Sequence, residues 1–515
     1  MIKNAAGRFI PESLPGLGIL KPYVGPFDYV PEGRKVGPKI VVDKPRSDKI
    51  LKSIDQAIEA TGLKDGMTIS FHHHFREGDG ILNQVIEAIA KKGIKGLTLA
   101  PSSLNSINDA IIPFIESGVI TAIETSGGRG ALGKLMTAGD KLSKPVIIRS
   151  HGGRARAIEA GDLKIDVAFL GASICDSYGN MNGFEGPSAC GSLGYAMVDA
   201  MHADQVVVVT DNLVPHPLKR ASIKQMYVDY IVATDYIGNR EKIVSGAVRI
   251  TKDPRELLLA QYATSVIEHS GYFKDHFSMQ LGTGGASLAA ARFLGDKMRK
   301  AQISARFGLG GITAPFVEML NEGLLDMIYD VQDFDLTGGE SLRDNPDKHV
   351  EISASQYANP HSCGPIVNNL DVVILSATEV DVDFNVNVIT NSNGLIMGAS
   401  GGHCDTAAGS ALSIVVAPLL RGRLPMVLDQ VDTIITPGST VDVIVTERGV
   451  AVNPLRQDLM DQLKDARVPV LNIQDLKKIA YDMAGEPAKI KKTDKVVAVV
   501  EYRDGTIIDT ITRPE

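Results

Sequence analysis

From residue 48 onward, apolar and polar positions follow two alternating periods. Helical spacing of apolar residues predicts helices over about 48–61 and 80–92, and a β-branched run between them predicts a strand over 67–71. Similar runs predict two further series of strands: 96–100, 120–126, 145–150, 166–173 and 204–211, and then 277–282, 303–311, 324–331, 371–378, 412–417, 433–437 and 441–447. Strands separated by helical patterns indicate an α/β protein with right-handed crossovers and mostly parallel sheets.

One segment of the chain occurs twice. The nineteen residues from Ile165 align without a gap with the nineteen from Leu370, and seven of these positions are identical. Such internal repetition is a stronger guide to architecture than local propensity. It predicts two tandem α/β domains of similar size, at 48–253 and 254–515, behind an extended arm at 1–47.

The arm is predicted because proline and glycine recur throughout residues 1–47, which excludes regular helix. We expect it to lie on its own domain or on a neighbouring subunit, and disorder is the alternative.

Composition and charge narrow the class of protein. Hydrophobic residues make up 44% of the chain and charged residues 22%, which is typical of a globular α/β enzyme. The formal net charge of −8 provides no basic surface for nucleic acid or anionic lipid, and the apolar runs are too short to span a membrane. The four cysteines show no paired spacing and the N-terminus lacks a secretory signal, so we expect a cytoplasmic protein.

The repeated segment differs at one chemically informative position. Ile174 of the first copy is replaced by Glu379 in the second. Open parallel sheets bind ligands beyond the carboxyl ends of their strands, so Glu379 is a candidate nucleophile or general base at such a crevice. A solvated or ion-paired loop carboxylate is the alternative.

Two glycine-rich turns are candidate binding sites. Their residues are Gly398, Gly401 and Gly402 in the later turn, and Gly282, Gly284 and Gly285 in the earlier one. Amides of the later turn would stabilise a tetrahedral oxyanion, each donor contributing about 3 kcal/mol, although a tight structural turn is the alternative. The earlier turn follows a strand and opens a helix, whose N-terminal amides favour a phosphate or carboxylate.

Two basic groups also follow predicted strands. They comprise His72, His73, His74 and Arg76 in the first group, and Arg149, Arg154 and Arg156 in the second. Arginine forks match carboxylates bidentately, so both groups are candidates to bind a polycarboxylate. The histidines have no partner with obvious ligand spacing, so we expect no metal site. Packing of the histidine loop and a solvated helix start at the arginines are the alternatives.

Longer strings carry a family resemblance. IDVAFLGASICDSYGN and LSATEVDVDFNVN, followed by GASGGHCD, resemble the paired signatures of the CoA-transferase superfamily. Together with SFHHHFREGD and NMNGFEGPSACGSLGYAM, the chain is similar over nearly its whole length to citrate lyase α subunits, a family of citrate CoA-transferases. The resemblance implies two NagB/RpiA/CoA-transferase-like domains, with Glu379 at the position of the glutamate that attacks the thioester and Gly401–Gly402 at the position of the oxyanion loop.

The resemblance also implies a reaction and partners. A citrate CoA-transferase exchanges acetate for citrate on the thioester of an acyl carrier protein or CoA, which yields a citryl-thioester and acetate. CoA or acetyl-CoA would serve as substrate, no cofactor would be bound covalently to this chain, and a prosthetic group derived from dephospho-CoA would sit on the carrier subunit. The expected partners are the β (citryl-lyase) and γ (acyl carrier) subunits, with this chain as a homo-oligomer within the larger complex.

Mechanism and acid specificity stay open at this point. Related transferases carry Gly-Gln-Val-Asn after the glutamate, whereas residues 383–387 of this chain read DFNVN. Both a covalent glutamyl route and a ternary complex, in which the citrate carboxylate attacks the thioester through a mixed anhydride, are therefore considered. The alternative functions are an acyl-CoA hydrolase, a transferase for another acid such as citramalate, and a noncatalytic scaffold or ligand-sensing subunit.

Overall fold

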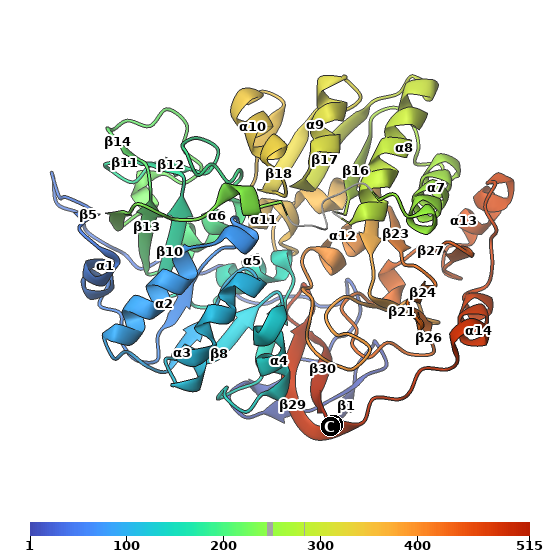
Figure 1. The fold of residues 1–515 in the computed structure, drawn as a ribbon, viewed down its shortest axis with the longest axis horizontal. Helices are drawn as coiled ribbons and strands as arrows, with labels where there is room; N and C mark the ends of the chain where they lie inside the picture. Colours follow the sequence, from blue (N-terminus) through green and yellow to red (C-terminus); the bar gives the residue numbers. More distant parts are fainter. Residues whose placement is uncertain (245–250, 283) are drawn as a thin grey trace.

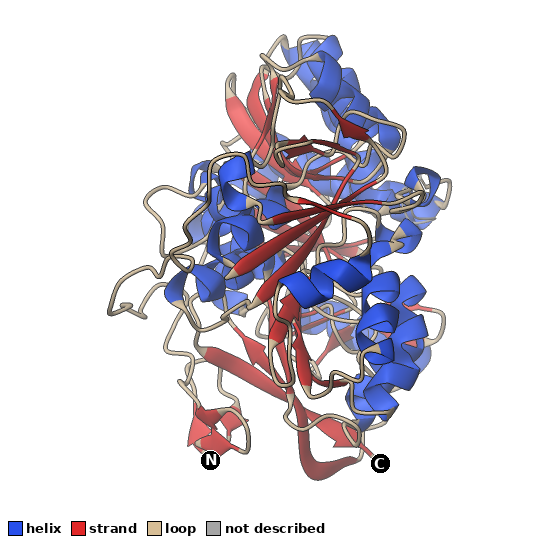
Figure 2. Cartoon of the chain, turned by 90° about the vertical axis from the view of Figure 1, so that its left-hand side faces the viewer, coloured by secondary structure: helices blue, strands red, loops and turns tan. Residues whose placement is uncertain are grey.

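Two α/β halves lie side by side in the computed structural model of the protein (Figure 1), which describes residues 1–244, 251–282 and 284–515. Figure 2 shows both termini at the same end of the molecule. No helix in the described ranges is both long and apolar enough to cross a membrane.

The first half is built on a ten-stranded sheet, as far as the described residues show. Its strands are β5 (Ile50–Leu51), β6 (Thr68–Ser70), β7 (Leu97–Leu99), β8 (Ile120–Thr125), β9 (Val146–Arg149), β10 (Val167–Ala172), β13 (Gln205–Thr210), β15 (Tyr230–Ala233), β29 (Lys492–Glu501) and β30 (Ile507–Pro514). Their order is β30-β29-β9-β8-β7-β6-β10-β13-β15-β5. Only the β29–β30 pair is antiparallel.

The second half contains an eight-stranded sheet within the same described ranges. Its strands are β16 (Phe277–Leu281), β17 (Ala305–Ile312), β18 (Ile328–Asp333), β19 (His349–Glu351), β20 (Val372–Ser376), β23 (Leu412–Val416), β27 (Val443–Thr446) and β28 (Gly449–Val452). In their order, β19-β18-β17-β16-β20-β23-β27-β28, the first seven strands repeat the order of the first sheet from β9 to β15. The outer strands differ, because β5 is parallel to β15 and β28 is antiparallel to β27. The predicted duplication of one fold is therefore confirmed.

Helices cover these sheets, as the alternating sequence pattern predicts. The α-helices are α1 (Ile54–Ala60), α2 (Ile81–Lys91), α3 (Ile112–Glu116), α4 (Gly130–Ala138), α5 (His151–Ala160), α6 (Gly194–His202), α7 (Pro254–His269), α8 (Gly285–Ala301), α9 (Ala314–Asn321), α10 (Leu336–Asp344), α11 (Ala354–Ala358), α12 (His403–Gly409), α13 (Gln457–Gln462) and α14 (Ile473–Ala484). Short 3₁₀ helices lie at Arg76–Gly78, Ser106–Ile111, Gln225–Tyr227, Arg240–Lys242, Ile366–Asn369, Gly438–Thr440 and Leu463–Asp465. Side-chain caps fix several starts, such as Ser150, whose hydroxyl accepts from the amide of Gly153 at α5.

A small three-stranded sheet accompanies each large one. The strands are β11 (Ile174–Asp176), β12 (Met181–Asn182) and β14 (Leu213–Val214) in the first half, and β21 (Glu379–Asp381), β22 (Val386–Asn387) and β26 (Val427–Leu428) in the second. Ile174 pairs with Asn182 in one sheet, and Glu379 pairs with Asn387 in the other. Ile174 and Glu379 thus occupy the same place in the two copies.

The C-terminal hairpin departs from the predicted division of the chain. Strands β29 and β30 lie within 254–515, yet β29 runs parallel to β9 and extends the sheet of the first half. The apolar residues 497–500 of β29 are buried there, so the hairpin is retained by the core of the first half. A second departure is the segment 433–437, a predicted strand that forms only an isolated bridge between Thr436 and Val386.

The N-terminal arm docks on its own chain over its first part. It forms two short hairpins, β1 (Ile2–Lys3) with β2 (Phe9–Ile10) and β3 (Ser13–Leu14) with β4 (Gly18–Ile19). Beyond them, residues 31–48 are exposed throughout.

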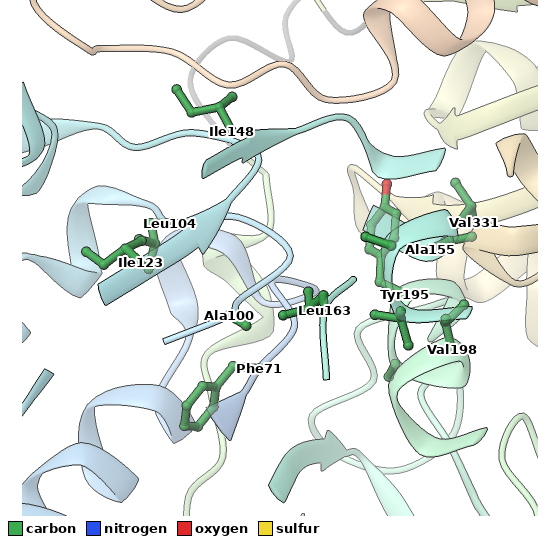
Figure 3. Close-up of a cluster of buried hydrophobic side chains, with 14 of the residues drawn as sticks. Phe71, Ala100, Leu104, Ile123, Ile148, Ala155, Leu163, Tyr195, Val198 and Val331 are labelled. Atoms are coloured by element: carbon green, nitrogen blue, oxygen red, sulfur yellow. The ribbon is translucent and has the colours of Figure 1, made fainter. Parts of the chain in front are cut away.

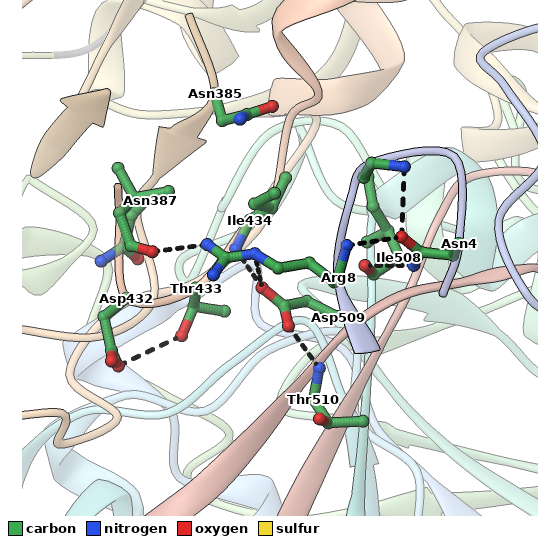
Figure 4. A network of polar contacts seen from close by, with 12 residues as sticks. Asn4, Arg8, Asn385, Asn387, Asp432, Thr433, Ile434, Ile508, Asp509 and Thr510 are labelled. Carbon is green, nitrogen blue, oxygen red and sulfur yellow. Dashed lines mark hydrogen bonds and ion pairs between the residues drawn. The ribbon is translucent and has the colours of Figure 1, made fainter. Parts of the chain in front are cut away.

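Polar contacts fasten the arm to both halves (Figure 4). The Asn4 side chain donates to the carbonyls of Ile507 and Ile508. Arg8 Nε lies 3.2 Å from Asp509 Oδ2, and its Nη2 donates to the Val431 carbonyl at 2.5 Å. The arm therefore ties the C-terminal hairpin to the segment 431–434 of the second half.

One continuous core runs from the first half into the second. Figure 3 shows Val331 of β18 beside Tyr195 and Val198 of α6. The same buried cluster includes Ile352 and Tyr357 of the second half. The halves are thus packed together through apolar side chains rather than joined by a linker.

The packing of the C-terminal hairpin into the core of the first half can be tested by mutation. Ile508 of β30 is fully buried, so Ile508→Ala should destabilise the protein by about 2–5 kcal/mol through lost burial and a residual cavity. Thermal unfolding of the full chain measures the effect. Ile40→Ala, at a side chain that is 93% exposed, is the matched control, and equal melting of the two variants would contradict the assignment of the hairpin to the core.

Candidate active site

The histidine loop begins where β6 ends, at the carboxyl edge of the first sheet. The amide of Gly171 donates to His72 Nε2 at 2.9 Å, so the proton of His72 resides on Nδ1, which faces Nδ1 of His74. Nδ1 of His73 lies 2.6 Å from the hydroxyl of Ser102. These contacts fix the loop beneath the neighbouring strand ends.

Aromatic rings stack in a column on this loop. The ring centroid of His73 lies 5.5 Å from that of His151 and 5.1 Å from that of Tyr195, and the His151 and Tyr195 centroids are 4.4 Å apart. Burial lowers the pKa of His73 well below its ordinary value and that of His151 to about 3. At neutral pH the column is therefore uncharged.

Positive charge next to the column comes from Arg76 and Arg129. The Arg76 guanidinium lies over the Phe334 ring, 4.5 Å from its centroid, and Arg129 Nη1 lies 3.3 Å from Asn105 Oδ1. Burial, followed by the positive charge of Arg129, lowers the pKa of Arg76 to about 10. Both guanidiniums remain charged at neutral pH, so the site repels cations and favours an anion.

Arg129 was not among the residues singled out from the sequence. It belongs to the turn Ser126-Gly127-Gly128-Arg129, directly after β8. The histidine loop was predicted as a binding site because its basic residues follow a strand directly. Arg129 also follows a strand, in a glycine-rich turn, so the same reasoning could have identified it.

The predicted oxyanion loop of the second half docks on these same strand ends. The amide of Gly128 donates to the Gly398 carbonyl at 3.1 Å, that of Ser400 to the Ser126 carbonyl at 2.7 Å, and that of His151 to the Gly401 carbonyl at 2.8 Å. A Cβ at Gly402 would lie 2.4 Å from the hydroxyl of Tyr357, so this position requires glycine. The glycine loop and the histidine column thus share one junction between the halves.

Glu379 lies in a separate pocket of the second half. Its carboxylate accepts from Asn387 Nδ2 and from the Ser392 hydroxyl, each at 3.0 Å. Burial raises its pKa, although these two hydrogen bonds oppose the shift. The pocket measures about 480 Å³ and is bounded by Arg8 and by parts of 424–432 and 481–492. Among the described residues, no member of the histidine column lines it.

The three arginines of the second basic group are engaged by carboxylates. Nη1 of Arg149 lies 2.5 Å from the Glu124 carboxylate, and its Nε lies 2.9 Å from the Glu501 carboxylate. Glu501 also forms an ion pair with Arg156. The pair formed by Arg154 and Asp199 is bidentate, at 2.6 and 2.8 Å. All three arginines are buried. This arrangement favours a role in holding the fold.

The earlier glycine turn has a pocket of its own. Gly284 and Gly285 line a space of about 260 Å³ at the start of α8, together with Ser376 and Arg421. Thr283, which the sequence places in the same turn, lies outside the described residues. The pocket adjoins that of Glu379 through the hairpin of β24 (Leu420–Arg421) and β25 (Leu424–Pro425).

The duplicated halves, with an acidic side chain in one copy and a glycine loop docked at the junction, define a protein with a CoA-transferase-like fold. The family model of the citrate lyase alpha subunit (CitF) matches residues 47–513. The citrate lyase alpha chain of Klebsiella pneumoniae is 54% identical over 466 residues, 90% of this chain and 91% of that protein. That of Escherichia coli K12 is 54% identical over 469 residues, 91% and 92% of the two chains. The chain belongs to the citrate lyase alpha subunit family.

Solved structures agree with this membership. A crystal structure from Streptococcus mutans, assigned as the alpha subunit of citrate lyase in complex with citrate, superposes with a TM-score of 0.95 at 52% identity, covering 99% of this chain and 100% of that one. A Pseudomonas malonate decarboxylase hetero-tetramer contains a chain with a TM-score of 0.62 at 15% identity, covering 86% of this chain and 84% of that one. The second likeness concerns the fold alone.

The raised pKa of Glu379 predicts a pH-dependent difference in stability. Its folded-state pKa lies above the ordinary value of 4.5, so its contribution to stability is complete below about 4.5 and is lost as pH rises through the folded-state pKa. We expect the parent to lose stability relative to Glu379→Gln as pH rises from 4.5, measured as urea unfolding midpoints across a pH series.

Glu486→Gln is the matched control, because Glu486 lies in the same pocket but is exposed. This variant should follow the parent. A gap between the parent and Glu379→Gln that does not change with pH would contradict the prediction.

Proposed function

We propose that this chain is the citrate CoA-transferase subunit of citrate lyase. It exchanges acetate for citrate on a thioester and so produces citryl-thioester and acetate. The observation that carries the proposal is the placement of Arg76 and Arg129 beside an uncharged histidine column, at the junction where the Gly398–Gly402 loop docks. The citrate complex of the similar Streptococcus mutans protein supports the same acid.

Charge explains why a tricarboxylate suits this junction. Two half-buried guanidiniums repel each other, and Glu77 is the acidic residue whose charge acts on both. A bound polycarboxylate would relieve that repulsion and accept charge-assisted hydrogen bonds. The neutral histidines and Tyr195 offer polar contacts and exclude water without adding charge.

The glycine loop and Glu379 are the proposed chemical groups. Amides near Gly401 and Gly402 would stabilise the oxyanion that forms when a carboxylate attacks the thioester. Glu379 acts as nucleophile or as an orienting base, and its buried, hydrogen-bonded carboxylate is held in one geometry by Asn387 and Ser392. Thioester exchange is nearly isoenergetic, so positioning and exclusion of water are the main catalytic demands.

The wider setting belongs to the same proposal. The thioester would be carried by the prosthetic group of an acyl carrier subunit, and a lyase subunit would cleave the citryl product, all in the cytoplasm. Arg149, Arg154 and Arg156 would support the substrate site indirectly, through the strand and helix that present His151.

Glu379 is tested by the exchange reaction. With acetyl-CoA and citrate as substrates, Glu379→Gln should lower kcat on the order of 10²–10⁴-fold, the usual contribution of a positioned acid–base group. Glu486→Gln, in the same pocket, should leave kcat unchanged. Undiminished exchange by Glu379→Gln would remove Glu379 from the chemistry.

The covalent and ternary routes separate in the absence of citrate. The enzyme is mixed with acetyl-CoA alone, treated with borohydride and analysed by peptide mass spectrometry. Reduction of Glu379 supports the covalent glutamyl thioester. An unmodified Glu379 with intact exchange activity supports direct attack by citrate.

The arginine pair predicts a change specific to citrate. Arg76→Gln and Arg129→Gln should each raise the KM for citrate roughly 10- to 150-fold, since a charge-assisted hydrogen bond contributes about 1.5–3 kcal/mol, while the KM for acetyl-CoA changes little. Arg292→Gln, on the exposed side of α8, is the control.

Arg149→Gln provides the contrast. It breaks a buried ion pair, so it should lower stability by about 3–5 kcal/mol rather than act on citrate selectively. If Arg149→Gln alone raised the KM for citrate and Arg129→Gln did not, the assignment of the two arginine groups would be reversed.

A further inference from the structure

Three potential metal ligands meet inside the second half, next to the candidate active site. Asp330 and Asp333 lie on β18, and His349 begins the adjacent parallel strand β19. Their ligand atoms all lie within 4.8 Å of one another, and all three side chains are buried. The expectation of no metal site concerned the histidine loop. Asp330, Asp333 and His349 share no short motif and are brought together by the pairing of β18 with β19.

The group contains buried polar atoms without hydrogen-bond partners. Within the described ranges these atoms are both carboxylate oxygens of Asp330, Oδ1 of Asp333 and Nε2 of His349. Nε2 of the fully buried His349 points toward the carboxylates and lies 3.3 Å from Oδ2 of Asp330. Buried groups of this kind are almost always satisfied, so the four atoms require either a proton shared between the carboxylates or a bound ligand.

The surroundings orient these ligands as outer-shell partners do in metal sites. Nδ1 of His349 is held by the Ser341 hydroxyl at 3.0 Å, which directs Nε2 toward the carboxylates. Asp333 Oδ2 accepts from the amide of Ser192 at 3.0 Å. A Cβ at Gly191 would lie 1.8 Å from that oxygen, so the loop of the first half approaches the carboxylate as closely as only glycine allows.

Two explanations fit two adjoining buried carboxylates. Like charges this close cannot both stay ionised alone, so the pair either shares a proton or holds a cation. A shared proton links the two carboxylates, while Nε2 of His349 then faces Oδ2 of Asp330 at 3.3 Å in a geometry that makes no hydrogen bond. A cation satisfies all three residues at once.

We propose that Asp330, Asp333 and His349 bind a divalent transition-metal cation, with Mn²⁺ and Zn²⁺ as the candidates. Two carboxylates and one imidazole form a donor set that such ions accept. The ion fastens the carboxyl end of β18 to the Gly191–Ser192 loop of the first half. Gln332 lies between the two aspartates in sequence, and its side chain donates to the His73 carbonyl at 3.2 Å. The ion therefore acts as a structural pin for the wall of the junction that carries the histidine column.

The test is metal binding by the full chain after dialysis against EDTA. Mn²⁺ and Zn²⁺ are titrated separately by calorimetry, and metal content is then measured by inductively coupled plasma mass spectrometry. One equivalent should bind and should raise the thermal unfolding midpoint, since a ligand of the native state stabilises it. His349→Gln should lower the affinity at least roughly tenfold and abolish the thermal shift.

His276→Gln is the matched control. His276 also lies near two aspartates, Asp275 and Asp326, but on the surface, where its side chain is 65% exposed. This variant should bind the metal as the parent does. Ser341→Ala keeps all three ligands and removes only the orienting hydroxyl, so a tenfold or greater loss of affinity is expected even if His349→Gln folds poorly.

Two results would overturn the proposal. In the first, the parent binds neither ion more tightly than His349→Gln and Ser341→Ala. In the second, Asp330→Asn and Asp333→Asn melt at or above the temperature of the parent whether or not metal is added, which would show that the pair shares a proton. None of these readouts depends on transferase activity, so failure here is distinct from failure of the proposed function.

Discussion

The return of the C-terminal hairpin to the first sheet is the constraint on which the candidate site depends. Glu501, at the end of β29, lies between Arg149 and Arg156, and a buried guanidinium without such a carboxylate is strongly destabilising. This ion-pair network fixes the end of β9, where Ser150 caps α5 and His151 joins the stacked rings. The last strands of the chain therefore hold the part of the junction that carries His151, which lies more than 300 positions earlier in the chain.

Duplication explains how the two halves divide the chemistry. Both halves keep the small three-stranded sheet beside the large one. The first copy carries Ile174 where the second carries Glu379. The first half contributes the cationic and aromatic groups of the junction. The second contributes the glycine loop that docks there and Glu379 in its own pocket. One ancestral scaffold thus carries different side chains in its two copies.

Local pattern predicted most strands and helices, because their apolar residues pack in the periods that the sequence shows. The helix predicted over 48–61 is wrong at its start, where Ile50–Leu51 form β5 and α1 begins at Ile54. The β-branched run at 205–210 is a fully formed strand, and the helix predicted at 80–92 extends over 81–91. Long-range pairing could not be predicted. Arg149 was predicted as a substrate ligand because its ion-pair partner, Glu501, lies 352 positions away in the sequence and could not be recognised there. The run at 433–437 has strand-like composition, but it lies in a loop whose amides are satisfied by Val386 and Asp509.

The electrostatics of the junction determine which group can respond to pH. Burial holds the pKa values of His72 and His151 near 4 and 3, and that of Arg76 stays near 10. These groups therefore keep one charge state between about pH 5 and 8, and the affinity for an anion contributed by them is constant there. Glu379 is different, because burial raises its pKa above the ordinary value of 4.5. Under the proposed role of Glu379, a change in transferase rate on the acid side would report the ionisation of Glu379, while citrate binding at the proposed junction site would follow the charge of citrate itself.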